Sequence, residues 1–403
     1  MAIPGVKKKN STPSAGGNNA RVKVIGVGGG GGNAVSRMAQ DFVRGVDFIA
    51  INTDAQDLEY CSARHKLYVG KNLTRGLGTG MNPELGAQAA EENRSDIAEL
   101  VKGADLIFIT AGMGGGTGTG ASPIVADVAR QSGALTIGVV TKPFLFEGAQ
   151  RSRVAEEGIQ KLREKVDALI VVPNDKIFTV IDKDTPIMKA FEKIDEVLRN
   201  AVQGIVELVT APGIINVDFA DVQTVMQNSG TAIIGLGIAS GPDRAVKAIT
   251  QAINFPLLDV NAEGAKGILL SVSGNRDLRM TEVNQAARLI VEMVDPNAKI
   301  IFGAYHDRKL KSGQIKVTLI ATGFTGTKPN GNGSSSLFGA EEKPAKSFLD
   351  SPLGDLGSAI DMKPLETPAV RTVGAKEKQP LKKESEKQED KWDIPAFLRR
   401  RKK

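Results

Sequence analysis

The chain has 403 residues, of which 41% are hydrophobic and 24% are charged, and it carries a formal net charge of +6. This length suits roughly two domains of about 100 to 200 residues each. A single cysteine excludes an intramolecular disulfide, and two histidines without a cysteine cluster exclude a structural zinc site. No apolar run approaches the roughly 18 residues that span a bilayer, and no signal-peptide pattern opens the chain, so we expect a cytoplasmic protein.

The positive charge lies near the two ends of the chain. Residues 373–403 carry 11 Lys and Arg against 6 Asp and Glu, and Lys7, Lys8 and Lys9 add charge near the start. The chain between these ends is weakly acidic, so we expect no nucleic-acid partner. A basic terminus instead suits an acidic partner or an anionic membrane.

Residues 1–20 are rich in Gly, Ser, Pro and Lys, and we expect them to form a disordered extension. From 21 to 184, short apolar strands alternate with amphipathic helices, which is typical of a parallel α/β sheet with helices on both faces. The expected strands are 22–27, 47–52, 105–110, 135–141 and 168–173, and the expected helices begin near 34 or cover 84–101, 122–131 and 151–162.

A broad apolar stripe between 185 and 213 predicts a long central helix, which Pro212 and Gly213 end. Residues 214–323 then predict a second, independent α+β domain attached to this helix. Its expected strands are 232–239, 267–273, 299–304 and 314–321, and its expected helices are 220–226, 242–253 and 282–294.

The last part of the chain has few large apolar side chains. Residues 324–390 have the composition of a disordered linker. Residues 391–403 differ, because Trp392, Phe397 and Leu398 stand among charged residues there. This segment predicts a docking peptide with a basic end.

Two glycine-rich runs follow predicted strands directly. The run 112–120 has six glycines in nine residues, and 26–33 is another such run before a helical pattern. A backbone without Cβ atoms can direct several N–H groups at one anion, and the positive end of the following helix adds to this attraction. The two runs therefore predict a nucleotide site that uses both loops.

Each run alone leaves other interpretations open. Gly26, Gly28 and Gly31 fit the dinucleotide fingerprint, with Asp54 after the next strand, so a nicotinamide-dependent oxidoreductase is an alternative. A second alternative is a glycine-rich turn that serves only the packing of the helix on the strand and binds no ligand. A second phosphate loop in the same domain favours a compact triphosphate, and neither run has the Gly-Lys-Ser/Thr ending of P-loop GTPases.

Several motifs together closely resemble the FtsZ family, the bacterial relatives of tubulin. They include 73–80 (LTRGLGTG), 112–120 (GMGGGTGTG), 216–221 (NVDFAD) and 393–398 (DIPAFL). The resemblance covers nearly the whole chain and implies a Rossmann-like parallel-sheet GTPase domain, a long central helix and a second α+β domain. It also implies head-to-tail polymerisation into the ring that organises cell division, at mid-cell beneath the membrane.

The same resemblance assigns residues to a GTP or GDP molecule. The phosphates would lie between two sets of loop residues, which are Gly29, Gly30, Gly31, Gly32 and Asn33 on one side and Gly116, Thr117 and Gly118 on the other. The segment 78–82 would reach the γ-phosphate, and Thr79 and Met81 stand where the family usually has alanine. Mg²⁺ is expected to bind through phosphates and water, without a protein metal site.

The ribose and the base have their own implied contacts. Glu147 and Arg151 would hold the ribose side, and Asn174 and Asp195 would bind the guanine edge. A carboxylate suits guanine because it can accept from N1–H and the 2-amino group, and adenine presents no such pair of donors. The alternative for Asp195 is a solvated charge on the central helix.

Asp218 and Asp221 stand three residues apart around a predicted helix start, so both can face one direction. The residue types alone favour helix capping. The resemblance instead implies that these acids, with Asn216, enter the nucleotide pocket of the next subunit and position the attacking water. An alternative is a nucleotide-binding scaffold that assembles without turnover.

The resemblance also implies partners for the docking peptide. Asp393, Ile394, Pro395, Phe397 and Leu398 would bind membrane-tethering division proteins of the FtsA, ZipA or SepF kind. Arg399–Lys403 would add attraction to anionic lipid or an acidic surface. The main expected partner is a second copy of the chain, in a head-to-tail homopolymer.

Overall fold

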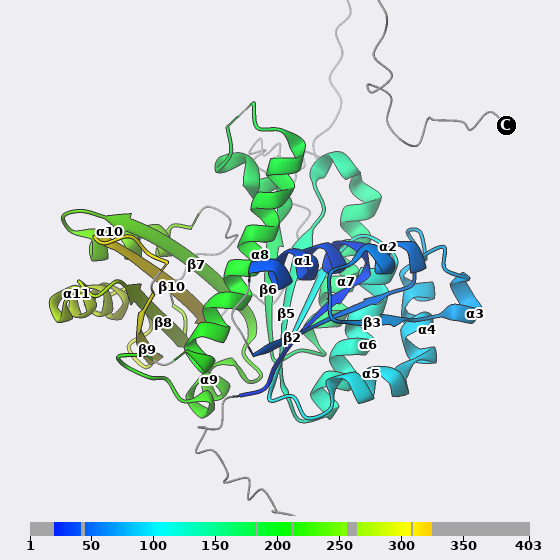
Figure 1. Ribbon diagram of the computed structural model, residues 1–403, viewed down its shortest axis with the longest axis horizontal. Helices are drawn as coiled ribbons and strands as arrows, with labels where there is room; N and C mark the ends of the chain where they lie inside the picture. The colour runs from blue at the N-terminus through cyan, green and yellow to red at the C-terminus, as the bar shows by residue number, and fades with distance from the viewer. Residues whose placement is uncertain are drawn as a thin grey trace, which may run out of the picture. The chain divides into compact units, whose positions relative to one another are not determined.

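The computed structural model describes residues 20–41, 45–182, 184–211, 213–255, 264–307 and 309–324. The predictions for the N-terminal extension up to residue 19, the linker from residue 325 and the docking peptide fall outside the described residues. The described residues form a ten-stranded sheet with helices packed against it (Figure 1). None of the described helices is long and apolar enough to cross a membrane.

The first half of the sheet is parallel, because helical connections return the chain across the sheet between successive strands. Side chains alternate between the two faces, so Val24 joins the apolar core on one face and Ile25 joins the core on the other. The strands are β1 (Val22–Val27), β2 (Val46–Asn52), β3 (His65–Tyr68), β4 (Leu106–Gly112), β5 (Leu135–Lys142) and β6 (Ala168–Pro173), in the order β3-β2-β1-β4-β5-β6.

Helices cover both faces of this half, as expected. One apolar core contains residues of α1 (Gly28–Asp41), α2 (Ala55–Tyr60) and α8 (Ile187–Thr210). The core on the opposite face contains residues of the helices α4 (Pro83–Glu92), α5 (Arg94–Val101), α6 (Thr117–Gln131) and α7 (Ala149–Arg163). The short helix α3 (Lys71–Thr74) precedes α4 in the chain.

Two local predictions are wrong. The single helix expected over 84–101 divides into α4 and α5 at Asn93, whose backbone leaves the helical region. The Asn93 side chain accepts a hydrogen bond from the Gly70 N–H at 2.9 Å and donates to Asp96 at 2.8 Å. Helices α1 and α6 also begin at Gly28 and Thr117, inside the glycine runs and before the expected starts.

The second half continues the same sheet. Strand β7 (Gly230–Ser240) pairs in parallel with β6 over three residue pairs, and then with β10 (Gln314–Thr322), which pairs with β8 (Gly267–Gly274), and β8 with β9 (Lys299–His306). A separate apolar core lies under α10 (Arg244–Ile253) and α11 (Met280–Val291). The second half therefore has its own core but shares its sheet with the first half, which the strand patterns alone do not reveal.

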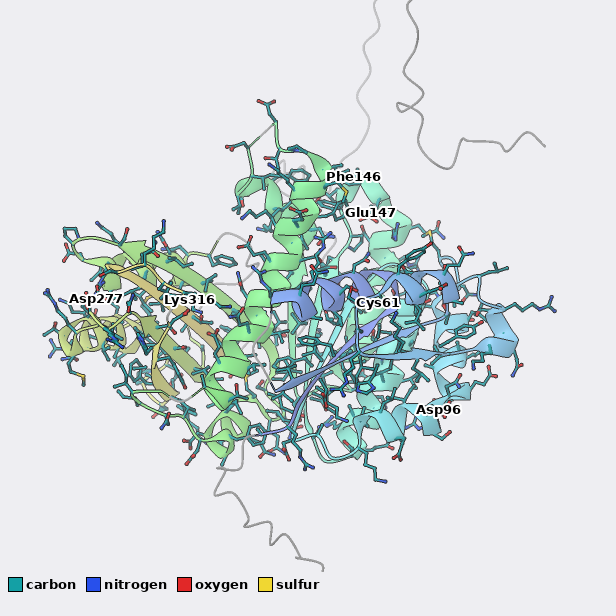
Figure 2. The ribbon with its side chains drawn as sticks, viewed as in Figure 1. Cys61, Asp96, Phe146, Glu147, Asp277 and Lys316 are labelled. Atoms are coloured by element: carbon teal, nitrogen blue, oxygen red, sulfur yellow. The ribbon has the colours of Figure 1, made fainter. Side chains whose placement is uncertain are left out.

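The long helix α8 joins the two halves. Gly204 allows close packing, because a Cβ there would lie 2.6 Å from the Thr318 side chain. Lys316, on β10 beside α8 (Figure 2), forms an ion pair with Glu207 at 3.0 Å. The buried Tyr305 hydroxyl donates to the Leu208 carbonyl at 3.0 Å. Helix α9 (Phe219–Met226) follows at the far end of α8 (Figure 1).

Helix α10 packs so closely on β7 that only glycine fits at Gly237, where a Cβ would overlap the Ala248 carbonyl oxygen. We predict that Gly237→Ala lowers the free energy of unfolding by about 1–3 kcal/mol, because the helix must move away from the strand. Gly115→Ala is the matched control, since a Cβ there meets nothing within 4 Å. Urea unfolding of both variants measures the difference, and equal stability would contradict the packing argument.

Candidate functional site

The carboxyl ends of β1, β2, β4 and β5 open into a cavity of about 730 Å³. Ligands of open α/β sheets bind in this position, outside the carboxyl ends of the strands. The structure brings most of the predicted site residues to its lining, which are Gly29, Gly30, Asn33, Gly116, Thr117, Gly118, Glu147, Arg151, Asn174 and Asp195. Arg37, Asp54 and Asp57 also line it, and sequence reasoning assigned the cavity neither Arg37 nor Asp57.

Gly31 and Gly32 do not line this cavity. A Cβ at Gly31 would overlap the Thr110 carbonyl oxygen, so this glycine serves the packing of α1 on the sheet. Gly32 faces the buried Cys61, whose thiol lies 3.5 Å from the Gly32 carbonyl. Both residues therefore pack the loop against the rest of the domain and do not face the cavity.

The two glycine loops touch through their backbones. Gly28 has a φ of +71°, and a Cβ there would lie 2.8 Å from the Gly118 nitrogen. Because α1 and α6 begin in these loops, both helix N-termini open onto the cavity with their free N–H groups. This arrangement fits a polyphosphate held between two sets of backbone donors.

Three buried threonine hydroxyls lie behind this contact. The Thr117 Oγ1 lies 2.6 Å from Thr53 Oγ1 and 3.0 Å from Thr79 Oγ1. The Gly116 N–H donates to the Gly80 carbonyl at 2.9 Å. The segment 78–82 is thus attached to the second glycine loop through both a side chain and the backbone.

One wall of the cavity carries the residues expected at a ribose and a base. Arg151 and Glu147 form an ion pair at 2.9 Å, and Glu147 lies next to the exposed Phe146 in Figure 2. Asn174 is buried, and its Oδ1 has no hydrogen-bond partner. A buried acceptor without a partner is costly, so this oxygen favours a ligand that carries an N–H donor.

The Asp195 carboxyl group has a pKa above its ordinary value. Burial raises its pKa to about 6, although the Arg37 guanidinium at 2.6 Å opposes this shift. Glu192 adds to the rise in pKa through charge repulsion. The structure therefore does not support the alternative of a freely solvated charge on α8.

Asp54, the acidic residue of the dinucleotide interpretation, lines the cavity and also has a structural role. The Asp54 carboxylate caps α2 by accepting from the backbone N–H groups of Gln56 and Asp57, at 3.0 and 3.1 Å. The Asp57 carboxylate accepts from the Asn52 side chain at 2.7 Å, and burial and Asp54 raise its pKa.

Within the described residues, no group of three or more His, Cys, Asp or Glu could hold a metal ion.

Asn216, Asp218 and Asp221 are exposed and lie outside the cavity lining. Fifteen residues of α8 separate Asp195 from Thr210 at the end of the helix, which corresponds to about 22 Å at 1.5 Å per residue. The Asp218 side chain makes no capping hydrogen bond to α9, so the capping interpretation is not supported.

The loop that carries these acids is held in place. Asn216 accepts a hydrogen bond from the Gly213 N–H at 2.7 Å, and Ile215 forms an antiparallel bridge with Ala304 on β9. The acids therefore stand on a fixed surface.

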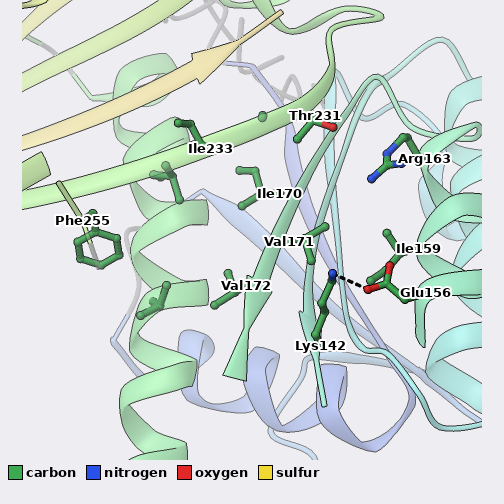
Figure 3. A pocket seen from close by; sticks show the side chains of 13 residues that line it. Lys142, Glu156, Ile159, Arg163, Ile170, Val171, Val172, Thr231, Ile233 and Phe255 are labelled. Carbon is green, nitrogen blue, oxygen red and sulfur yellow. Dashed lines mark hydrogen bonds and ion pairs between the residues drawn. The ribbon is translucent and has the colours of Figure 1, made fainter. Parts of the chain in front are cut away.

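A second, smaller cavity of about 140 Å³ lies where β6 and β7 separate (Figure 3). Apolar side chains such as Ile170, Val172 and Phe255 line it, and Lys142 and Glu156 form an ion pair of 2.6 Å at its edge. None of the predicted site residues lines this cavity.

The burial of Asp195 generates a stability prediction. In the unfolded chain this carboxylate ionises near its ordinary pKa of 3.8, whereas in the folded protein it ionises near 6. As the pH rises from 3.8 to 6, the carboxylate ionises in the unfolded chain before it ionises in the folded protein. The free energy of unfolding therefore falls over this range, and the loss is complete above pH 6. We predict that Asp195→Asn raises the free energy of unfolding of the nucleotide-free protein by about 1–3 kcal/mol at pH 7.5.

Urea unfolding from pH 4.5 to 7.5 measures this effect. The advantage of Asp195→Asn over the parent should shrink as the pH falls from 6 toward 4. A parent that is more stable than the variant at pH 7.5 would mean that the Arg37 ion pair outweighs the desolvation of Asp195.

Comparison with known proteins agrees with this geometry. Residues 21–182 match the GTPase domain of the Tubulin/FtsZ family, and residues 230–325 match the FtsZ family C-terminal domain. An empty FtsZ dimer from M. jannaschii is 45% identical, with a TM-score of 0.72 over 75% of this chain and 88% of that chain. A mutant FtsZ from the same organism is also 45% identical, with a TM-score of 0.72 over 76% of this chain and 92% of that chain.

More distant structures share the fold. The GTPγS-bound protofilament of CetZ2 from Haloferax volcanii is 23% identical, with a TM-score of 0.64 over 75% of this chain and 92% of that chain. The two family models, the FtsZ structures and the glycine-loop cavity agree in implying a guanine nucleotide site. The chain belongs to the FtsZ family of tubulin-related GTPases.

Proposed function

We propose that the chain assembles head to tail and hydrolyses GTP at the junctions between copies. The observation that carries this proposal is the separation along α8, where Asp195 stands about 22 Å before the end of the helix and the acids follow that end. Asp218 and Asp221 are too far away to act in the cavity of their own chain. The same two acids of a second copy would reach the cavity of the first.

A patch of apolar side chains beside the cavity supports the assembly. Leu145, Phe146 and Phe178 are 78%, 69% and 57% exposed, and Ile187 and Met188 at the start of α8 are also exposed. An exposed apolar cluster marks an interaction surface. At the opposite end of α8, Ile214 is 68% exposed next to the acids. When two different surfaces of the chain bind each other, copies join head to tail, and the contact does not close, so an open filament forms.

The proposed chemistry is phosphoryl transfer to water. Asp218 and Asp221 of one copy orient the attacking water, and Asn216 fixes their loop. Asp195, when ionised, accepts from guanine N1–H and the 2-amino group, and the Asn174 Oδ1 accepts a further N–H. When bound with the nucleotide, Mg²⁺ would offset negative charge on the phosphates, and no residue of the chain is assigned to hold it.

The wider role is part of the same proposal. The filament forms the scaffold of the division ring at mid-cell, in the cytoplasm beneath the membrane. Residues 391–403 recruit membrane-tethering division proteins, with Arg399–Lys403 adding attraction to anionic lipid.

We predict that Asp218→Ala and Asp195→Ala each abolish most GTP turnover, for opposite reasons. The first variant keeps its cavity and the second keeps its acidic loop. A mixture of the two should regain part of the parent turnover, because each filament then contains junctions with an intact cavity and an intact loop. Phosphate release and sedimentation, measured against protein concentration, follow turnover and polymer together.

Glu99→Ala is the matched control, since Glu99 is an exposed acid on α5 far from the cavity lining. Turnover of the parent should appear only above the concentration at which polymer pellets. Full turnover by Asp218→Ala would mean that Asp218 has no part in hydrolysis, and a mixture no more active than its parts would contradict a site shared between copies.

The docking peptide gives a separate prediction. A chain that ends at residue 390 should keep its GTP turnover and its GTP-dependent pelleting, because none of the residues assigned to the cavity or to the acidic loop is removed. It should lose flotation with vesicles that carry a membrane-tethering partner. Unchanged flotation would mean that another part of the chain binds the membrane or the partner.

A further inference from the structure

The smaller cavity, of about 140 Å³, lies where β6 and β7 stop pairing. The pairing of these strands ends at Ile170 and Ala232, and no further pair joins them in the part of the chain that the structure describes. The gap that follows reaches from α7 on one face of the sheet to α8 on the other, because Ile159 and Val197 both line it.

The walls of this cavity are mainly apolar. Ile159, Ile170, Val172 and Ile233 are buried there, and Phe255 closes one side (Figure 3). An apolar cavity of about 150 Å³ in a protein core stays free of water and can bind benzene. The cavity between β6 and β7 therefore suits an apolar group of about six carbon atoms.

One cationic side chain of the lining has no partner. Arg163 of α7 forms no hydrogen bond or ion pair with any residue that the structure describes, and its Nε atom is buried. In Figure 3 its guanidinium points from α7 toward the strands. A buried N–H donor without an acceptor is costly, so this group favours an anionic ligand.

The other charged groups at the cavity neutralise each other. Lys142 and Glu156 form an ion pair at 2.6 Å, and with Arg163 they are the charged residues of the described lining. The remaining charge is therefore the positive charge of Arg163. A guanidinium offers parallel N–H groups that match the two oxygens of a carboxylate.

We propose that this cavity binds a short-chain aliphatic carboxylate, whose head group Arg163 holds and whose alkyl chain lies in the gap between β6 and β7. An aliphatic carboxylate is ionised at neutral pH, so it combines the charge and the apolar surface that the cavity requires. No residue lines both this cavity and the cavity at the glycine loops, so the two sites are separate.

The test is a ligand-observed NMR titration of the full chain, without nucleotide, with hexanoate. We expect saturable binding of one molecule per chain. The affinity should rise about fourfold for each methylene from butanoate to hexanoate, and it should level off for longer chains, because the cavity is then full. Hexan-1-ol, which has the chain without the charge, should bind more weakly than hexanoate.

Arg163→Gln should lower the affinity for hexanoate about tenfold or more and leave the affinity for hexan-1-ol unchanged. Arg153→Gln is the matched control, since Arg153 is an exposed arginine of the same helix that pairs with Glu157 and lies outside the lining. This variant should bind hexanoate as the parent does. Saturating GDP should not displace hexanoate from the parent.

The inference is overturned if the parent shows no saturable binding of hexanoate, or if Arg163→Gln binds it as tightly as the parent. Equal binding of hexan-1-ol would remove the role of the charge. Equal binding of acetate or inorganic phosphate would mean a simple anion site, and displacement by GDP would place the ligand at the glycine loops. Thermal unfolding without ligand tests whether Arg163→Gln is folded, and Arg163→Met replaces it if it is not.

Discussion

The site depends on the backbone contact between the two glycine loops. Strands β1 and β4 are neighbours in the sheet, so the loops that follow them leave the same edge side by side. Their contact at Gly28 and Gly118 leaves no room for a Cβ. Helices α1 and α6 begin inside these loops, and their N-termini therefore converge on one cavity, which neither loop could form alone.

Helix α8 connects the cavity, where it carries Asp195, with the acidic loop that follows its other end. Its side chains pack in the core beneath the first half, and Glu207 and Leu208 near its end are bonded to Lys316 and Tyr305 of the second half. These contacts hold the end of the helix on the second half, and about 22 Å of helix separates Asp195 from that end. A fixed spacing is what a filament needs if each copy must present its loop to the next at the same height.

The sequence predicts the strands and the long helices well, because their apolar periodicity reflects burial directly. It misses β3, where two of the four residues are exposed, and the break at Asn93, which depends on a hydrogen bond to Gly70. The cavity residues Arg37 and Asp57 carry no local signal, since only the packing of α1 and α2 brings them to the cavity. The threonine cluster likewise joins residues that are up to 64 positions apart.

The charges of the cavity explain why backbone donors matter so much there. Its lining contains two cationic side chains and four carboxylic ones, which are Arg37, Arg151, Asp54, Asp57, Glu147 and Asp195. Such a lining does not attract a polyphosphate by its side chains. The attraction must come from the helix N-termini and the N–H groups of the glycine loops, and from a cation carried by the nucleotide. This balance fits the proposed Mg²⁺, and it leaves the buried Asp195 the proposed role of selecting the base while other groups bind the phosphates.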